Sequence, residues 1–288
     1  MKSFLQLNTI FVSILIESIP FILIGVFISG IIQMFVTEEM VKKWVPKNKV
    51  LAVLYSALIG VLFPACECGI VPITRRLVTK GVPLHAAIPF MLTGPVVNPI
   101  VLFSTYIAFG SNFKMVIYRA VFAYIVAVMV GLILSIQYKK DEQLRNQEVI
   151  HASPSRTLKE KWMGTLEHTV EEFFTSGKYL IIGAFIASAM QTYVKTSTLL
   201  AIGHGKMTAS LVMMALAFVL SLCSEADAFI ASSFQNTFSF GALAAFLVYG
   251  PMLDIKNTLM LLQSFKTRFV LVLIAYITLF VFIGSLLI

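Results

Sequence analysis

A short stretch, residues 63–76, places reactive side chains in a region that is otherwise apolar. It has the sequence FPACECGIVPITRR and holds two thiols, Cys66 and Cys68, with Glu67 between them. Thiols bind soft metals or exchange disulfides, and a carboxylate inside a membrane protein commonly marks a solute or proton path. Metal binding, redox chemistry and solute recognition are therefore alternatives here, beside buried cysteines with no reactive role.

The cysteine pattern limits these alternatives. A structural zinc ion needs four ligands at fixed spacing, and the rest of the chain offers no Cys or His pair that would complete the set. We therefore predict no metal and no cofactor. A disulfide between Cys66 and Cys68 would close a strained ring, although a redox pair stays open. With Cys223 the chain has three cysteines, too few for a disulfide framework.

Proline and glycine residues around the thiols predict a break in the helical backbone. Proline removes a hydrogen-bond donor and clashes with the preceding helical turn, so Pro64, Gly69 and Pro72 argue against an uninterrupted helix. In a helix Cys66 and Cys68 would point about 200° apart, whereas in an extended segment they face the same side. We expect an unwound segment here, which membrane proteins tolerate only where protein buries it or it lines a cavity.

A second pair of breaks is predicted further along the chain. The segment TGPVVNP at 93–99 contains Gly94, Pro95 and Asn98, and the segment YGPMLD at 249–254 matches it, with Asp254 in the place of Asn98. Asn98 would either bind a ligand or cap the next half-helix. Lys256, two residues after Asp254, is a candidate ion partner for that carboxylate.

Ionisable groups within apolar segments indicate a solute or proton path. The segment SLCSEADAFIASSF holds Cys223, Glu225 and Asp227 among small residues, which permit close helix approach. Carboxylates at membrane depth are costly and mark functional sites by default. Arg119 lies near the end of its apolar segment, where its side chain could reach the interface. Glu171 and Glu172 fall at the expected start of the fifth segment, where a helix N-terminus favours carboxylates.

Composition assigns the chain to the membrane. Hydrophobic residues make up 58% and charged residues 12%, with a mean hydropathy of +0.90, whereas soluble domains are about 25% charged. The formal charge of +8 sits in short runs between apolar segments, so we read it as a topological signal and predict no nucleic-acid partner. We expect an all-α polytopic protein of the plasma membrane with about eight transmembrane helices, near 8–36, 50–64, 82–108, 114–138, 168–194, 207–223, 240–262 and 267–287.

The chain divides into two similar halves, 1–138 and 163–288, around a basic linker. Residues 23–36 align with 181–194 at six identities in fourteen, and at the same offset Glu67 falls on Glu225. We therefore predict an internal repeat with broken helices. Four crossings in each half would make the repeats parallel, and an odd number would invert them.

The linker, 139–162, is cytoplasmic by the positive-inside rule because it carries six Lys or Arg residues. Eight crossings then place both termini inside as well, together with Arg75, Arg76 and Lys80. The same count places the lysine-rich loop at 42–49 outside, against the rule.

Four segments resemble the predicted permeases of the YraQ/ArsP type, a family that includes organoarsenical efflux permeases. They are PACECGIVPITRRL at 64–77, GVPLHAAIPFMLTGPVVNPI at 81–100, LCSEADAFIASSF at 222–234 and YGPMLD at 249–254. The resemblance extends over nearly the whole chain. It implies a plasma-membrane permease with about eight spans, a cysteine that binds trivalent arsenicals in the arsenical branch, and a second small membrane protein as partner in some relatives.

The combined interpretation is a permease that exports a small solute by alternating access. The solute would be a thiol-seeking species, such as an organoarsenical or a soft metal. No GxxxxGK[ST] motif is present, so the chain has no nucleotide site of that type to drive transport. The alternatives are a membrane thiol oxidoreductase and a non-transporting subunit. The predicted site residues are Cys66, Glu67, Cys68, Gly94, Pro95, Asn98, Cys223, Glu225, Asp227 and Asp254.

Overall fold

The computed structural model describes residues 2–63, 65–138, 143–144, 157–193 and 205–288, and these residues are almost entirely helical. The helices of the first half are α1 (Lys2–Phe35), α2 (Glu38–Trp44), α3 (Lys49–Leu62), α4 (Glu67–Thr79), α5 (Leu84–Val97), α6 (Pro99–Ala108) and α7 (Phe113–Gln137). Those of the second half are α8 (Leu158–Tyr193), α10 (Lys206–Leu220), α11 (Ser224–Ser233), α12 (Phe240–Met252), α13 (Ile255–Ser264) and α14 (Thr267–Leu287).

Five helical segments in the described residues are long and apolar enough to cross a membrane: 3–35, 84–108, 113–137, 158–193 and 267–287. The apolar helices α3 and α10 are shorter than a membrane span. The all-α polytopic class is thus confirmed, while the count of eight crossings stays a prediction.

The predicted breaks at 93–99 and 249–254 are present as helix ends. Asn98 has an extended backbone because the residue before a proline avoids the helical region, and its side chain accepts a hydrogen bond from the Val101 N–H. Asp254 caps α13 in the same way by accepting from the Asn257 N–H. In both halves one apolar segment is therefore divided into two helices, α5 and α6 or α12 and α13.

One end of the molecule collects most of the described basic residues, and we call it the basic end. There the Lys80 ammonium donates to the Gln33 carbonyl at 2.6 Å, and the Lys49 ammonium donates to the Ser135 carbonyl at 3.1 Å. These contacts join the end of α4 to the last turn of α1, and the start of α3 to the last turn of α7. Lys161, near the start of α8, also lies here, with its ammonium 5.8 Å from the centre of the Phe35 ring at the end of α1.

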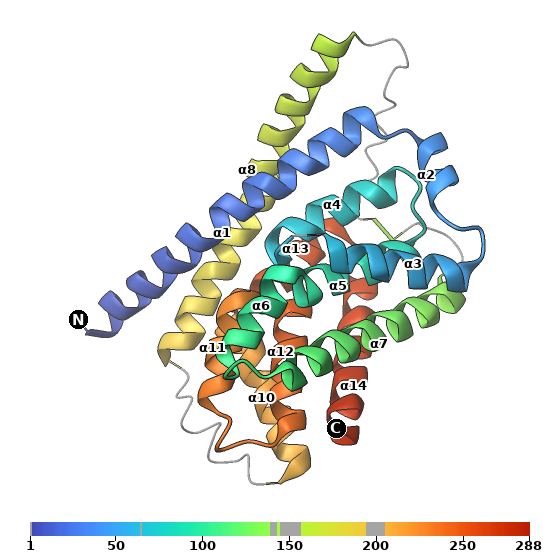
Figure 1. Cartoon of the computed structure of the whole chain (residues 1–288). Coiled ribbons are helices and arrows are strands. Elements are labelled where there is room, and N and C mark those ends of the chain that lie inside the picture. The colour runs from blue at the N-terminus through green and yellow to red at the C-terminus, as the bar shows by residue number, and fades with distance from the viewer. Residues whose placement is uncertain (1, 64, 139–142, 145–156, 194–204) are drawn as a thin grey trace.

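Both termini lie toward the opposite end (Figure 1). Helix α14 runs antiparallel to α7, because Phe269 packs on Tyr138 near the basic end and Gly284 contacts Phe122 further away. Helix α1 likewise begins at the opposite end, and its last turn, with Gln33, lies at the basic end. Both termini thus lie away from the end of α7, after which the linker starts, whereas eight crossings would place them on the same side as the linker.

Two pairs of helices turn back within the molecule, and this accounts for the positions of the termini. Helix α3 runs from the basic end to the break before Glu67, and α4 returns to the basic end, parallel to α1. In the second half α10 starts at the opposite end, where Lys206 donates to the Leu286 carbonyl at 2.9 Å, and α11 returns to that end. The two hairpins, α3–α4 and α10–α11, therefore enter the molecule from opposite ends.

Glycine allows two close approaches that fix the hairpins and broken helices against the long helices. A Cβ on Gly25 of α1 would lie 2.5 Å from the Gly69 Cα of α4, and one on Gly183 of α8 would lie 2.9 Å from the Lys256 Cα of α13. Helices α1 and α8 also pack antiparallel against each other, with the Phe35 and Trp162 rings 5.4 Å apart. The broken helices α5 and α12 are buried at the centre.

Candidate functional site

The helices that begin at the breaks pack in pairs across the two halves. Helix α4 packs against α13, and α11 packs against α6. Buried polar side chains gather at or beside the starts of these helices, and we call them the central polar cluster: Glu67, Arg119, Ser221, Ser224, Asp227, Asp254 and Lys256. The N-terminus of a helix carries a partial positive charge, so helix starts at such a site favour negatively charged groups.

Glu67 connects the two halves. It is 2% exposed at the first position of α4, and its Oε2 accepts a hydrogen bond of 3.1 Å from the Ser224 hydroxyl at the start of α11. Its Oε1 lies 3.9 Å from the Lys256 ammonium of α13. A single carboxylate thus touches both broken segments of the second half.

Asp254 holds the other side of the lysine. Its Oδ2 lies 3.7 Å from Lys256 Nζ and accepts a hydrogen bond of 2.7 Å from the Ser221 hydroxyl. Ser221 has a left-handed backbone, with φ of 48°, at the end of α10. Non-glycine residues in this conformation carry strain and cluster at functional sites. The ion partnership that the sequence suggested between Asp254 and Lys256 is present, and it extends to Glu67.

Arg119 is fully buried instead of reaching the interface. Its guanidinium donates to the Thr105 hydroxyl at 2.8 Å and to the Ser224 carbonyl at 3.2 Å. The snorkelling interpretation is therefore wrong, because the side chain extends from α7 toward the start of α11. The same serine that bonds Glu67 through its hydroxyl bonds Arg119 through its carbonyl.

Asp227 is buried in the first turns of α11 and faces the backbone of α12. A Cβ on Gly250 would lie 2.8 Å from its Oδ2, so glycine leaves the space that the carboxylate fills. Neither carboxylate oxygen has a hydrogen-bond partner among the described residues, and Asp227 is 1% exposed. A buried carboxylate without a partner is costly unless it binds a proton or a cation.

The thiols lie beside this cluster. Cys66 caps α4 without a side-chain hydrogen bond to its first turn, Cys68 is in that turn, and both are buried. The Cys223 thiol donates to a Glu225 carboxylate oxygen at 2.7 Å. In the parts of the chain that the structure describes, no group of three or more His, Cys, Asp or Glu side chains could hold a metal ion.

The predicted unwound segment is shorter than expected. The described backbone between α3 and α4 is non-helical only from Phe63 to Cys66, with Pro64 outside the described residues, and Cys68, Gly69 and Pro72 lie within α4. Pro72 is the sixth residue of α4, and its missing N–H leaves the Cys68 carbonyl without its intrahelical partner. The two thiols therefore do not share an extended strand.

Gly94, Pro95 and Asn98 lie at or just before the break between α5 and α6. Gly94 and Pro95 are buried in α5, where the Gly94 Cα faces the Ile70 side chain of α4. Asn98 is occupied by capping α6 and by a donated hydrogen bond of 3.4 Å to the Gly94 carbonyl. Of its two expected roles, ligand or cap, the structure shows the cap.

Glu172 has a different setting from the one that the sequence suggested. Helix α8 begins at Leu158, so this carboxylate lies well inside the helix and is buried. Its Oε2 lies 3.1 Å from an Arg76 guanidinium nitrogen and accepts a bond of 2.7 Å from Ser29. It joins α8 to α4 and α1 and lies outside the central polar cluster.

Ser221 and Ser224 were missed by sequence reasoning, because an isolated serine carries no signal of its role. The available signal was position: each serine stands next to a predicted break, where a hydroxyl can bond to groups that the helices leave unpaired. Lys256 and Arg119 were noticed, but their joint contact with the helix starts depends on packing between the halves.

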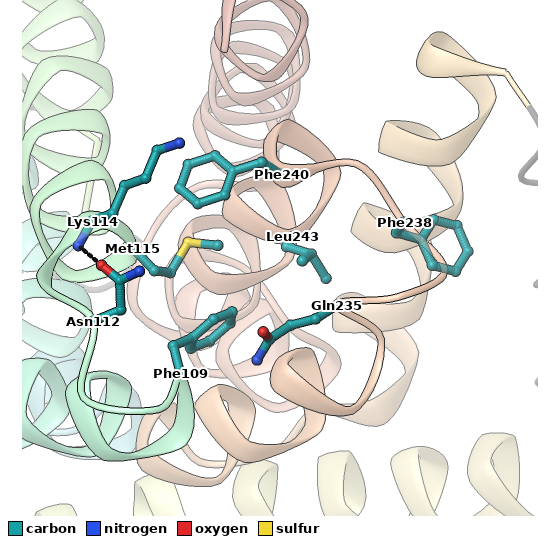
Figure 2. A pocket seen from close by; sticks show the side chains of 8 residues that line it. All are labelled: Phe109, Asn112, Lys114, Met115, Gln235, Phe238, Phe240 and Leu243. Atoms are coloured by element: carbon teal, nitrogen blue, oxygen red, sulfur yellow. Dashed lines mark hydrogen bonds between the residues drawn. The ribbon is translucent and has the colours of Figure 1, made fainter.

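A pocket of about 230 Å³ lies at the ends of α6 and α11 (Figure 2). Both halves line it, with Phe109 and Lys114 from one and Gln235 and Phe240 from the other. The Lys114 ammonium lies 4.9 Å from the centre of the Phe240 ring. This pocket is separate from the central polar cluster in its lining residues.

Known proteins are similar to this chain over all or part of its length. The UPF0718 protein YcgR of Bacillus subtilis is 66% identical over 288 residues, covering 100% of this chain and 98% of that protein. A putative two-component membrane permease complex subunit of Streptococcus mutans is 46% identical over 94% of this chain and 90% of its own length. The UPF0718 protein MJ0584 of Methanocaldococcus jannaschii is 25% identical over 49% of this chain and 38% of its own length.

No solved structure matches the chain. The family described as predicted permease, ArsP_1, matches residues 3–288. Together with the buried polar cluster between broken helices, this match identifies the chain as an integral membrane protein that belongs to the ArsP_1 family of predicted permeases.

Proposed function

We propose that this permease moves a small solute through the central polar cluster by alternating access. The observation that carries the proposal is the contact of Glu67 with both Ser224 and Lys256. Transporters commonly bind solutes at mid-membrane, where broken helices from two repeats meet. The central polar cluster has these features: it holds buried charged side chains, it lies at helix starts, and both halves contribute residues to it.

Inverted repeats would give this site two equivalent exits. In chain order α1, α3, α4, α5, α6 and α7 correspond to α8, α10, α11, α12, α13 and α14. The hairpins α3–α4 and α10–α11 enter from opposite ends, which supports repeats of opposite orientation, 1–138 and 163–288. Rocking one repeat against the other would open the site to each side in turn.

The basic end would face the cytoplasm by the positive-inside rule. The loop at 42–49 and the linker at 139–162 are then both inside, which removes the conflict that eight crossings create. The chain would cross the membrane with α1, α5–α6, α7, α8, α12–α13 and α14, while the two hairpins re-enter. Both termini would lie outside.

Energy for transport would come from a proton or ion gradient. Asp227 supports this assignment best among the three candidate carboxylates, because it is buried and unpaired within the described residues. Glu67 is held by Ser224 and Lys256, and Glu225 accepts from Cys223. A proton on Asp227 would relieve the cost of its burial and would be lost when the site opens to water.

Export of a thiol-seeking solute is the finer proposal. Cys66, Cys68 and Cys223 all lie beside the helix starts of the cluster and are free thiols. Thiolates bind soft species such as trivalent arsenicals, and the family resemblance points to the same class. The alternative of a thiol oxidoreductase uses the same pair, Cys66 and Cys68, and differs in its product.

A growth screen followed by transport tests these proposals. A deletion strain is exposed to arsenicals, soft metals and thiol-reactive compounds, and each hit is measured in proteoliposomes with the purified protein. We expect sensitivity that the intact gene restores, with solute flux that Asp227→Asn reduces at least tenfold. Turnover of thiols without flux would instead support the oxidoreductase, and an unaltered strain would contradict a thiol-seeking solute.

A second subunit is proposed from the name of the Streptococcus mutans relative, a putative two-component membrane permease complex subunit. If a partner is required, protein purified alone will show no flux, and co-expression with the partner will restore it. Full flux by the single chain would contradict this requirement and would also exclude a purely non-transporting role.

A further inference from the structure

A groove of about 420 Å³ opens between α1 and α3 near the basic end. Helix α2 closes its end through Val41 and Trp44, and the floor is formed by α4 and α5. The lining side chains are almost all apolar, including Ile73 and Leu77 of α4 and Ala86 of α5. The groove shares no residue with the central polar cluster or with the pocket in Figure 2.

The groove extends from the membrane surface toward mid-depth. It is lined at one end by Trp44 and Pro46, beside the basic loop, and at the other by Phe63, which follows the last residue of α3. Helix α3 has 14 residues and is therefore about 21 Å long. One leaflet contributes about 15 Å of hydrocarbon, so the groove spans roughly the depth of one acyl chain.

The open side of the groove faces the bilayer. Tyr55 and Ile59 form its rim on α3 and are 47% and 39% exposed, and their neighbour Leu58 is 55% exposed. Apolar cavities do not hold water, because water needs polar partners there. A groove of this size that opens into hydrocarbon is therefore filled by hydrocarbon.

Charge at the mouth selects the lipid. Lys43 and Lys47 are exposed on either side of Trp44 and Pro46, while Lys49 is engaged with the Ser135 carbonyl. Glu38 and Glu39 lie in the first turn of α2, and neither lines the groove; Glu39 is one helical turn before Lys43. Lysines near a membrane surface attract anionic lipid. Trp44, 60% exposed, suits the interface between headgroups and hydrocarbon.

We propose that this groove is a binding site for one anionic glycerophospholipid of the leaflet at the basic end. One acyl chain lies between α1 and α3 against Ile73 and Ala86, and the phosphate lies between Lys43 and Lys47. The acyl chain contacts α4 of the hairpin α3–α4, so the bound lipid stabilises the position of that hairpin. The proposal does not depend on the identity of the solute.

Native mass spectrometry of the purified protein tests the site. The protein is equilibrated in mixed micelles with equal phosphatidylglycerol and phosphatidylcholine, and the retained lipid is counted. We expect one tightly held lipid per chain, with phosphatidylglycerol preferred at least about fivefold because two lysines face its phosphate. Equal retention of the two lipids, or none, would overturn the assignment.

Two variants locate the lipid. Ile59→Trp fills the rim of the groove and is expected to lower retention at least fivefold, whereas Ile125→Trp, on the exposed face of α7, leaves it unchanged. The pair Lys43→Gln and Lys47→Gln is expected to abolish the preference for phosphatidylglycerol, whereas Lys159→Gln with Lys178→Gln retains it. Thermal unfolding of each variant checks that it is folded.

A competing occupant gives the opposite result. If a second membrane subunit fills the groove, the co-purified complex will hold no lipid that Ile59→Trp displaces, and cross-links from position 59 will reach the subunit. Retention of one lipid by Ile59→Trp at the wild-type level would likewise show that the lipid binds elsewhere.

Discussion

The Ser224 hydroxyl donates a hydrogen bond of 3.1 Å to the Glu67 carboxylate across 157 positions of the chain. The two residues occupy the first positions of α11 and α4, the return helices of the hairpins that enter from opposite ends. The backbone of the same serine accepts from Arg119. The two halves therefore contact each other at the centre of the molecule through this serine.

Lys256→Ala is expected to destabilise the protein by about 3–5 kcal/mol, because it leaves the Glu67 and Asp254 carboxylates buried without their shared cation. Thermal or denaturant unfolding in detergent measures the loss. Lys178→Ala, an exposed lysine on α8, is the matched control and should shift stability by less than about 0.5 kcal/mol. Equal stability of the two variants would mean that the charges are not paired as described.

Gly25→Ala is expected to cost about 1–3 kcal/mol, since its Cβ would fall 2.5 Å from the Gly69 Cα and force α1 away from α4. Gly177→Ala in α8 is the control, because its Cβ would meet nothing within 4 Å of the described residues. Alanine is the better helix former, so this control should be neutral or more stable. A Gly25 variant as stable as the control would contradict the close packing of α1 on α4.

Arg119→Lys is expected to cost about 1–3 kcal/mol, because one ammonium cannot replace the forked guanidinium that bonds both Thr105 and Ser224. A double-mutant cycle with Thr105→Val separates the hydroxyl contact from the rest. Coupling above about 0.5 kcal/mol is expected. Additive effects would indicate that the two side chains do not interact.

The topology predicts opposite accessibility for two introduced cysteines. Asn236→Cys, in the exposed turn after α11, should react in intact cells with a membrane-impermeant maleimide, and Lys47→Cys should react only after permeabilisation. The native cysteines are buried, so unmodified protein gives the background. Eight crossings with both termini inside would reverse this pattern, and such a reversal would exclude the inverted arrangement.

The thiol contribution is separable from transport. Cys66→Ser with Cys68→Ser is expected to lower flux of a thiol-seeking solute at least tenfold while the folded protein remains, because serine matches cysteine in shape but binds soft species poorly. Flux is measured in proteoliposomes, and unfolding is measured beside it. Unchanged flux would leave the permease proposal standing and assign the cargo site to other groups of the cluster.

Much of the architecture follows from the sequence for local reasons. An apolar chain in lipid must satisfy its backbone hydrogen bonds internally, which predicts helices. Proline after Asn98 and the capping side chains of Asn98 and Asp254 act within a few residues, so two of the breaks could be placed correctly. The predicted thiol-rich break is longer than the observed one, because Gly69 and Pro72 lie within α4.

Only the tertiary structure decided whether the chain continues or turns back at each break. An apolar segment of helical length can cross the membrane or turn back, and sequence periodicity is the same in both cases. The contact of Lys49 with Ser135 joins the start of α3 to the end of α7, and that of Lys80 with Gln33 joins the end of α4 to the end of α1. The positions of the termini therefore had to come from packing.

The central polar cluster shows the same division. The sequence by itself determined that buried carboxylates, thiols and helix starts exist near the breaks, because each carries a local cost or a local capping signal. Only the tertiary structure decided that Glu67 meets Ser224 and Lys256, that Arg119 is buried beside them, and that Glu172 lies elsewhere. Contacts between distant segments depend on how whole helices pack, and no single residue type encodes that.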